Sequence, residues 1–199
     1  MDKTKRRITK APSAKKSGQY HRLVIKLGTN LLTGGTGRLD LLTMTSLVDQ
    51  VAQLHQQGRE IVLVSSGAIA AGRDKLAADR NRKDIPFRQL LAAVGQGRLM
   101  HAYEQLFDRH GIVVAQALLT KRELSHRAGY LNARNTIFTL LEYGEIPVIN
   151  ENDTISVDEL MTTFGDNDRL AALVTNLLRA PLLVILSDVD GLYDGDPRE

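Results

Sequence analysis

Acidic and amide side chains are concentrated between residues 148 and 171, in the stretch VINENDTISVDELMTTFGDNDRLA. This stretch contains six carboxylates and three asparagines but a single cation, Arg169. Like charges packed this closely destabilise a fold unless a positive group pairs with them or water solvates them. The pattern therefore predicts a metal ion, a charged substrate or solvent as the partner of these side chains, which are Glu151, Asp153, Asp158, Glu159, Asp166, Asp168, Asn150, Asn152 and Asn167.

Lys26 is a second residue that could do chemistry, because it interrupts the apolar run LVIKL just before a glycine. A buried ammonium group is costly unless an anion lies beside it. Two interpretations are open, namely an edge-strand lysine whose ammonium reaches water and a lysine that binds a phosphate group. The sequence Gly-Lys-Ser/Thr does not occur, so a Walker A phosphate loop is excluded.

Five short runs of apolar, largely β-branched residues predict the strands that would position these side chains. Because the runs are continuous rather than alternating, both faces of each strand should be buried, as in a parallel sheet. The runs are 23–27, 61–65, 112–119, 146–150 and 182–187. Helical patterns lie between them, over 39–57, 88–110, 131–143 and 167–179, and the first three are followed by a glycine. The alternation predicts an α/β fold with a doubly wound layer structure.

Glycine-rich or polar turns lie at the ends of four predicted strands, with the sequences GTN, SGA, NEND and DVDG. In open parallel sheets, ligands bind beyond the carboxyl ends of the strands. Exposed backbone amides in such turns attract anions. This edge of the sheet is therefore predicted to bind a phosphate or carboxylate group.

The composition is that of a globular chain, with 199 residues of which 43% are hydrophobic and 25% are charged. This length is enough for one large domain or two small ones. The absence of cysteine excludes disulfides, zinc-thiolate sites and thiol nucleophiles. No apolar run approaches the roughly 20 residues of a membrane-spanning helix, and the N-terminus does not resemble a signal peptide. We therefore expect a soluble, cytoplasmic protein with no membrane partner.

The first 20 residues carry seven Lys or Arg and one Asp, so this segment has a charge of +6 within a chain whose net charge is +3. Such a basic arm could contact nucleic acid. However, no aromatic platform or groove-reading motif accompanies the charges. We interpret 1–20 as a basic, disordered N-terminal extension and 21–199 as the folded domain, and we expect no nucleic-acid partner.

A series of ordered motifs from about Arg22 to the C-terminus resembles the amino acid kinase family, and within it the glutamate 5-kinases. The motifs are VIKLGTNLLTGG, VLVSSGAIAAG, LLAAVGQGRLM, LNARNT, IPVINENDTIS, FGDNDRLAALV and SDVDGLYDGDPR. The resemblance implies an αβα sandwich with a mainly parallel central sheet, and it implies a homo-oligomer. It also implies an enzyme that uses ATP and Mg²⁺ to phosphorylate the side-chain carboxylate of L-glutamate. This reaction is the first step of proline biosynthesis, with proline as the expected feedback inhibitor.

The resemblance further implies roles for individual residues. Lys26 would contact the transferring phosphoryl group and Asp168 would orient Lys26, so both are predicted to be catalytic. L-glutamate would be bound by Ser66, Asp153 and Asn167. The nucleotide would be contacted by Lys26, Gly28, Ser187 and Asp188. No residue is assigned to a metal site.

Plainer interpretations remain open for several of these residues. Residues 166–168 could be the N-cap and first turn of a helix, Ser66 could cap the AIAAG segment, and Asp153 could close an Asx-turn. Residues 188–196 resemble a calcium loop only superficially, because the EF-hand spacing and its final glutamate are missing. The remaining acids are assigned to capping and solvent, and they are Glu151, Asp158, Glu159 and Asp166.

In this family the kinase domain continues beyond the DPR motif into a glycine-rich segment with a second catalytic lysine, which this sequence does not contain. We therefore expect a domain that is truncated at its C-terminus, with a glutamate-binding lobe and only the start of a nucleotide lobe. One hypothesis is a glutamate 5-kinase. The alternatives are a catalytically incomplete fragment that binds glutamate or proline or that dimerises, and another amino acid kinase of the N-acetylglutamate kinase type.

Overall fold

The computed structural model describes residues 20–77, 82, 84–156 and 166–187. Within these ranges, five strands alternate with seven helices along the chain. The strands are β1 (Arg22–Leu27), β2 (Glu60–Ser65), β3 (Val114–Leu119), β4 (Ile146–Glu151) and β5 (Leu182–Leu186). The helices are α1 (Thr29–Thr33), α2 (Leu41–Gln56), α3 (Ala68–Lys75), α4 (Ile85–Asp108), α5 (Lys121–Ser125), α6 (Arg127–Glu142) and α7 (Asp166–Leu178).

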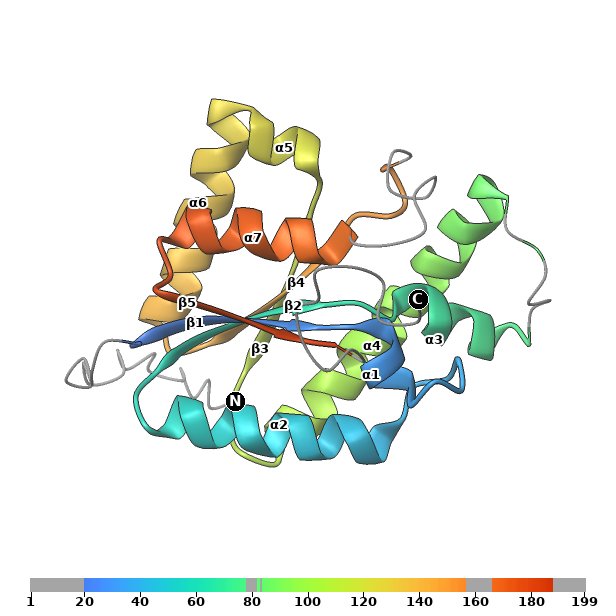
Figure 1. Ribbon diagram of the computed structural model, residues 1–199, viewed down its shortest axis with the longest axis horizontal. Helices are drawn as coiled ribbons and strands as arrows, with labels where there is room; N and C mark the ends of the chain where they lie inside the picture. The colour runs from blue at the N-terminus through green and yellow to red at the C-terminus, as the bar shows by residue number, and fades with distance from the viewer. Residues whose placement is uncertain (1–19, 78–81, 83, 157–165, 188–199) are drawn as a thin grey trace, which may run out of the picture.

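The five strands form one sheet with the order β3-β4-β2-β1-β5 (Figure 1). Each neighbouring pair runs parallel, and the register places Lys26 of β1 between Val64 of β2 and Ile185 of β5. Parallel strands need a crossover connection, which the intervening helices provide. The predicted α/β fold with a parallel central sheet is confirmed.

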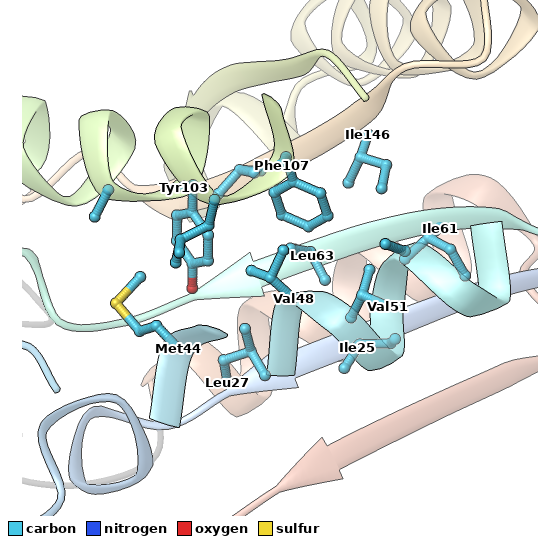
Figure 2. Close-up of a cluster of buried hydrophobic side chains, with 14 of the residues drawn as sticks. Ile25, Leu27, Met44, Val48, Val51, Ile61, Leu63, Tyr103, Phe107 and Ile146 are labelled. Atoms are coloured by element: carbon cyan, nitrogen blue, oxygen red, sulfur yellow. The ribbon is translucent and has the colours of Figure 1, made fainter. Parts of the chain in front are cut away.

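Helices cover both faces of the sheet, so the domain has three layers (Figure 1). On one face, α2 and α4 pack on the sheet around a core that includes Met44, Val48, Leu99, Tyr103 and Phe107 (Figure 2). On the other face, α6 and α7 pack on the sheet around Ile137, Leu141, Leu170, Val174 and Leu178. Alternate residues of each central strand pack in one core or the other, because successive side chains of a strand point to opposite faces of the sheet.

The expectation that every strand is buried on both faces is wrong for β3 and β5. These two strands are the edges of the sheet, and their side chains are mostly half-buried or exposed. Ile185, in the middle of β5, is 47% exposed. In contrast, all six residues of β4 are buried. A continuous apolar run indicates a parallel sheet but does not tell which strands lie at its edges, since strand order is set by the crossovers.

The predicted helices are present, together with three short helices outside the four predicted ranges, namely α1, α3 and α5; α3 begins in the AIAAG segment that Ser66 was considered to cap. These three helices have five, eight and five residues, too few for a clear helical period. The glycines expected at helix ends are confirmed, because Gly58, Gly111 and Gly144 follow α2, α4 and α6 with φ of 82°, 67° and 80°. This left-handed conformation suits glycine and ends a helix.

Two further expectations concern the chain ends and membranes. Residues 1–19 of the predicted basic extension lie outside the described residues. None of the helices in the described ranges combines the length and the apolar character that a membrane crossing requires.

Candidate active site

Of the turns predicted at the carboxyl edge of the sheet, GTN and SGA lie at the ends of neighbouring strands, whereas DVDG (188–191) lies outside the described residues. The amide of Ser66, just after β2, donates to the carbonyl of Leu27 at the end of β1 over 3.1 Å. The amide of Gly28, just after β1, donates to the carbonyl of Leu186 at the end of β5 over 3.3 Å. The carboxyl ends of the three neighbouring strands β2, β1 and β5 are thereby joined into one surface.

Lys26 and Asp168 form an ion pair on this surface, with 2.7 Å between Nζ and Oδ1. Lys26 is the last residue but one of β1 and lies on the α7 face of the sheet, like Val24. Asp168 lies in the first turn of α7. The side chain of Lys26 is only 12% exposed, whereas that of Asp168 is 45% exposed. The ammonium group is thus buried against an anion, as the cost of burying a charge requires.

The interpretation of Lys26 as an edge-strand lysine is wrong, because β1 pairs with a strand on each side. Gly28 lies close to the ammonium group: a Cβ atom placed there would be 3.4 Å from Lys26 Nζ and 3.4 Å from the Leu186 carbonyl oxygen. The backbone at Gly28 thus lies directly beside the ammonium group. An ammonium with one partner has further N–H groups to donate.

A second, uncharged group of side chains lies at the ends of β2 and β4. The Nδ2 atom of Asn167 donates to Ser66 Oγ over 2.6 Å and to the Ser65 carbonyl over 3.1 Å. It also lies 3.4 Å from Oδ1 of Asn150. Ser66 and Asn167, which were both predicted to bind the substrate, are therefore in direct contact. Asn167 and Asp168 do lie in the first turn of α7, as the capping interpretation expected, but their side chains contact strands β1, β2 and β4.

The interpretation of Ser66 as a helix cap is wrong. The N-cap of α3 is Gly67, with φ of 99°, and no side chain caps this helix end. The positive φ of Gly67 turns the chain sharply from β2 into α3. As a result the Ser66 hydroxyl is left to accept from Asn167.

Two helices that carry no predicted site residue come into backbone contact next to this group. A Cβ atom on Gly95 of α4 would lie 1.8 Å from the carbonyl oxygen of Ala68, and one on Gly72 of α3 would lie 1.9 Å from that of Leu91. Side chains at these two positions would push α3 and α4 apart. The glycines therefore hold α4 against the start of α3, only two residues after Ser66.

Three polar residues support the uncharged group, and sequence reasoning missed two of them, Gln96 and Tyr103; Asn150 was noted only as part of the acidic stretch. Asn150, at the end of β4, is 2% exposed and donates from Nδ2 to Oε1 of Gln96 over 2.8 Å. Tyr103 of α4 places its hydroxyl 2.8 Å from Oγ of Ser65. Figure 2 shows the Tyr103 ring between α4 and the sheet, with its oxygen directed at β2. Complete burial raises the pKa of the Tyr103 hydroxyl well above its usual range, so this group stays neutral.

The signal for these residues was faint. Asn150 ends an otherwise apolar strand, and Gln96 lies between two glycines of a helical pattern. A polar residue at either position is compatible with many surroundings, so neither position indicates a particular hydrogen-bond partner. Tyr103 lies seven residues after Gln96, which is about two helical turns, so both face the same side of α4. This spacing could be recognised in the sequence. The hydrogen-bond partners of these residues, which lie 38 and 54 positions away, could not be predicted from it.

The remaining predicted site residues are Asp153, Ser187 and Asp188, of which the structure describes the first two. Asp153 is half-buried in the loop that follows β4, and Ser187 is exposed directly after β5. The loop after β4 is tied to α4 by a bond of 3.3 Å from Gln89 Nε2 to the Thr154 carbonyl. Asp188 lies outside the described residues, as do Asp158 and Glu159. The roles proposed for Asp153, Ser187 and Asp188 therefore stay predictions.

One of the acids assigned to capping and solvent is placed differently. Glu151 is the last residue of β4 and is only 4% exposed. The assignment of Glu151 to solvent is wrong, because the strand that carries it is central and covered on both faces.

Comparison with known proteins gives consistent matches over most of the chain. Residues 21–199 match the Amino acid kinase family. Curated proteins named glutamate 5-kinase are similar to the chain, from Dehalococcoides mccartyi (strain CBDB1) at 58% identity, from Herpetosiphon aurantiacus at 55% and from Geobacter sulfurreducens at 54%. These matches cover 89%, 90% and 89% of this chain but 48%, 48% and 47% of the relatives. The chain thus spans about half the length of the curated relatives it matches.

Proposed function

The chain belongs to the amino acid kinase family, and from that premise we propose that it serves the ATP-dependent phosphorylation of the side-chain carboxylate of L-glutamate. This reaction forms L-glutamate 5-phosphate, the first step of proline biosynthesis. The observation that carries the proposal is the pairing of Lys26 with Asp168 beside the contact of Ser66 with Asn167. A cation suited to phosphate and a set of uncharged groups suited to an amino acid thus share one edge of the sheet. The names of the relatives support the same substrate.

In the proposed reaction, an oxygen of the substrate's side-chain carboxylate attacks the γ-phosphorus of ATP. A new O–P bond forms while the bond from that phosphorus to the bridging oxygen of ADP breaks, and ADP leaves with the electron pair. The attacking carboxylate is already deprotonated at neutral pH, so no proton needs to be removed. What the protein must supply is alignment and a positive charge at the transferring oxygens. Lys26, held by Asp168, is our candidate for that charge.

L-glutamate would be bound by Ser66, Asn167 and Asp153. The hydroxyl of Ser66 and the amide of Asn167 offer both donors and acceptors to the amino acid. Asp153 would pair with the α-ammonium group, which an acetylated amine does not possess. This difference in charge is our reason to prefer free glutamate over N-acetylglutamate as the substrate.

ATP would lie against Gly28, Lys26, Ser187 and Asp188, and we expect Mg²⁺ to enter with its phosphates. Across the parts of the chain that the structure describes, no three His, Asp or Glu side chains are grouped so that they could hold a metal ion. The ligands that we propose for Mg²⁺ are phosphate oxygens and water. The metal would neutralise phosphate charge when bound.

Three further elements belong to the proposal. Proline carries the same α-carboxylate and a positively charged amine as glutamate, so we propose that it inhibits by competing for the glutamate site. We also propose a homo-oligomer and a cytoplasmic location, as the family resemblance implies.

A thermal-shift screen with L-glutamate, L-proline, N-acetylglutamate and ATP tests the proposal, since a ligand of the native state raises Tm. We expect glutamate and proline to raise Tm and N-acetylglutamate to leave it unchanged. The variant Asp153→Asn should lose most of the glutamate response, while Asp108→Asn, far along α4, should keep it. Stabilisation by N-acetylglutamate but not by glutamate would overturn the choice of substrate.

A further inference from the structure

We propose that Gln96 is a positioning residue, which holds Asn167 in its substrate-binding orientation through Asn150; this presupposes the proposed glutamate site. Neither the family resemblance nor the polar turns at the strand ends pointed to Gln96. Its side chain accepts a hydrogen bond from Asn150 and, within the described residues, bonds to neither Ser66 nor Asn167. The proposal therefore adds a residue that does not touch the substrate but orients one that does.

A chain of three side-chain amides runs across three elements of the fold. It begins with Asn167 on α7, whose Nδ2 atom lies 3.4 Å from Asn150 Oδ1. It continues through Asn150 on β4, whose Nδ2 atom donates to Gln96 Oε1 on α4 over 2.8 Å. Residues 54 and 17 positions apart in the sequence are joined in this way.

The orientation of the middle amide is fixed from both ends. The backbone amide of Glu151 donates to Asn150 Oδ1 over 2.9 Å, so this atom must be the oxygen. The other end of the amide must then carry the NH₂ group, and it faces Gln96. Because Asn150 is 2% exposed, water is not available to replace either partner.

Removal of the Gln96 acceptor would leave the Asn150 NH₂ group buried without a partner, which is unfavourable. The Asn150 amide would then be oriented only by the bond from the Glu151 backbone amide to its Oδ1, so the position of that oxygen beside Asn167 would be less firmly fixed. The bonds from Asn167 to Ser65 and Ser66 would remain. The Oδ1 atom of Asn167 is buried and has no hydrogen-bond partner in the described part of the chain. This free acceptor suits an N–H donor such as the α-ammonium of glutamate, and its direction depends on the bonds made by Nδ2.

The backbone of Gln96 is itself held in place. Its neighbour Gly95 lies against the carbonyl of Ala68, at a distance that excludes any side chain. Ala68 is the first residue of α3 and follows Ser66 by two positions. Gln96 and Ser66 are therefore placed relative to each other by one backbone contact, which makes α4 a rigid support for the amide chain.

The test compares Gln96→Met, which has a similar length but no acceptor for an amide, with Gln96→Glu, which keeps an oxygen at Oε1. Calorimetry gives Kd for L-glutamate, and NMR follows the side-chain NH₂ signals of Asn150 and Asn167 without ligand. We expect Gln96→Met to raise Kd by roughly three- to tenfold, the size of one lost hydrogen bond. We also expect it to shift the NH₂ signals of Asn167. Gln96→Glu should have a Kd between the wild type and Gln96→Met.

Gln105→Met is the matched control, because Gln105 lies on the exposed side of the same helix. It should leave Kd and the NH₂ signals unchanged. A Gln96→Met variant that keeps both the wild-type Kd and the Asn167 signals would overturn the proposal. So would a Gln96→Glu variant that binds glutamate more weakly than Gln96→Met, because that order indicates direct contact between residue 96 and a carboxylate. A wild-type chain that does not bind glutamate would instead overturn the proposed function, and the NH₂ signals would still decide whether Gln96 orders Asn167.

Discussion

The first turn of α7 serves two regions with opposite character. Asn167 turns towards the ends of β2 and β4, where it meets uncharged groups, and its neighbour Asp168 turns towards β1, where it meets Lys26. Successive residues of a helix point about 100° apart, so one turn can reach different strands. We call the first region the recognition half, made of Ser66, Asn150 and Asn167, and the second the transfer half, made of Lys26, Gly28 and Asp168.

The halves differ in how firmly their side chains are held. In the recognition half, Asn150 is buried and bonded at both ends of its amide. In the transfer half, the single ion pair has one end that is 45% exposed. A buried network of bonds keeps one geometry, whereas a partly solvated pair can exchange partners. We infer that the recognition half is organised before the substrate arrives and that Lys26 can turn from Asp168 towards a phosphoryl group.

The largest effect that would separate the two halves is expected from Lys26→Ala. If Lys26 stabilises the transferring phosphoryl group, its removal should lower kcat for glutamate-dependent ATP turnover by about 10²- to 10³-fold. The Kd for glutamate should change little, because no recognition side chain contacts Lys26. Steady-state kinetics and calorimetry would measure the two quantities. Lys75→Ala, on the exposed end of α3, is the control and should leave both unchanged. A change in KM alone would contradict a role in the transition state.

The next largest effect concerns the support of the recognition half alone. Gly95→Ala should lower the free energy of unfolding by about 2 kcal/mol or more, since its methyl group would lie 1.8 Å from the Ala68 carbonyl oxygen. Urea denaturation followed by circular dichroism would measure it. Gly97→Ala, two residues further on α4, has nothing within 4 Å of the added carbon. That control should be neutral or more stable by about 0.5–1 kcal/mol, because alanine favours helix over glycine. Equal stability of the two variants would show that the close contact of Gly95 with Ala68 does not decide the cost.

Asn167→Ala should produce the opposite kinetic pattern to Lys26→Ala. It removes the donor to Ser66 Oγ and the Ser65 carbonyl, which become unpaired at the substrate surface. We expect Kd for glutamate to rise by roughly tenfold, which corresponds to about 1.4 kcal/mol, with a smaller change in kcat. Asn176→Ala, near the other end of α7, is the control. If Asn167→Ala lowered kcat without changing Kd, the division of the site into two halves would fail.

The charged residues of the candidate site give a stronger signal in the sequence than the neutral residues that support it, for a physical reason. A lysine within an apolar strand signals a buried charge, and a buried charge needs an anion, so Lys26 could be singled out from its neighbours alone. Gln96 and Tyr103 give no such signal, because a neutral polar residue on a helix is compatible with many surroundings. Gln96 and Tyr103 stabilise the site through hydrogen bonds to residues that are distant in the sequence. Strand order was hidden for the same reason, so the exposure of β5 could not be predicted.

Tyr103→Phe is expected to have the smallest effect. It tests whether the recognition half depends on the Tyr103 hydroxyl of α4 as well as on Gln96. Tyr103 donates to Ser65 Oγ, whose hydrogen is then directed at the Ser66 carbonyl, 3.0 Å away. Loss of this donor should lower the free energy of unfolding by about 1 kcal/mol, the usual net value of one hydrogen bond.

The aromatic ring and its packing on Phe107 remain in this variant, so no cavity is formed. We expect Kd for glutamate to rise by only about two- to threefold, because the Ser65 hydroxyl keeps its bond to the Ser66 carbonyl. Tyr143→Phe, with a tyrosine that is 51% exposed after α6, is the control and should match the wild type. A Tyr103→Phe variant with lower stability but unchanged Kd would restrict the role of the Tyr103 hydroxyl to stability. Gln96 would then be the side chain through which α4 sets the geometry of the recognition half, beside the backbone contact of Gly95 with Ala68.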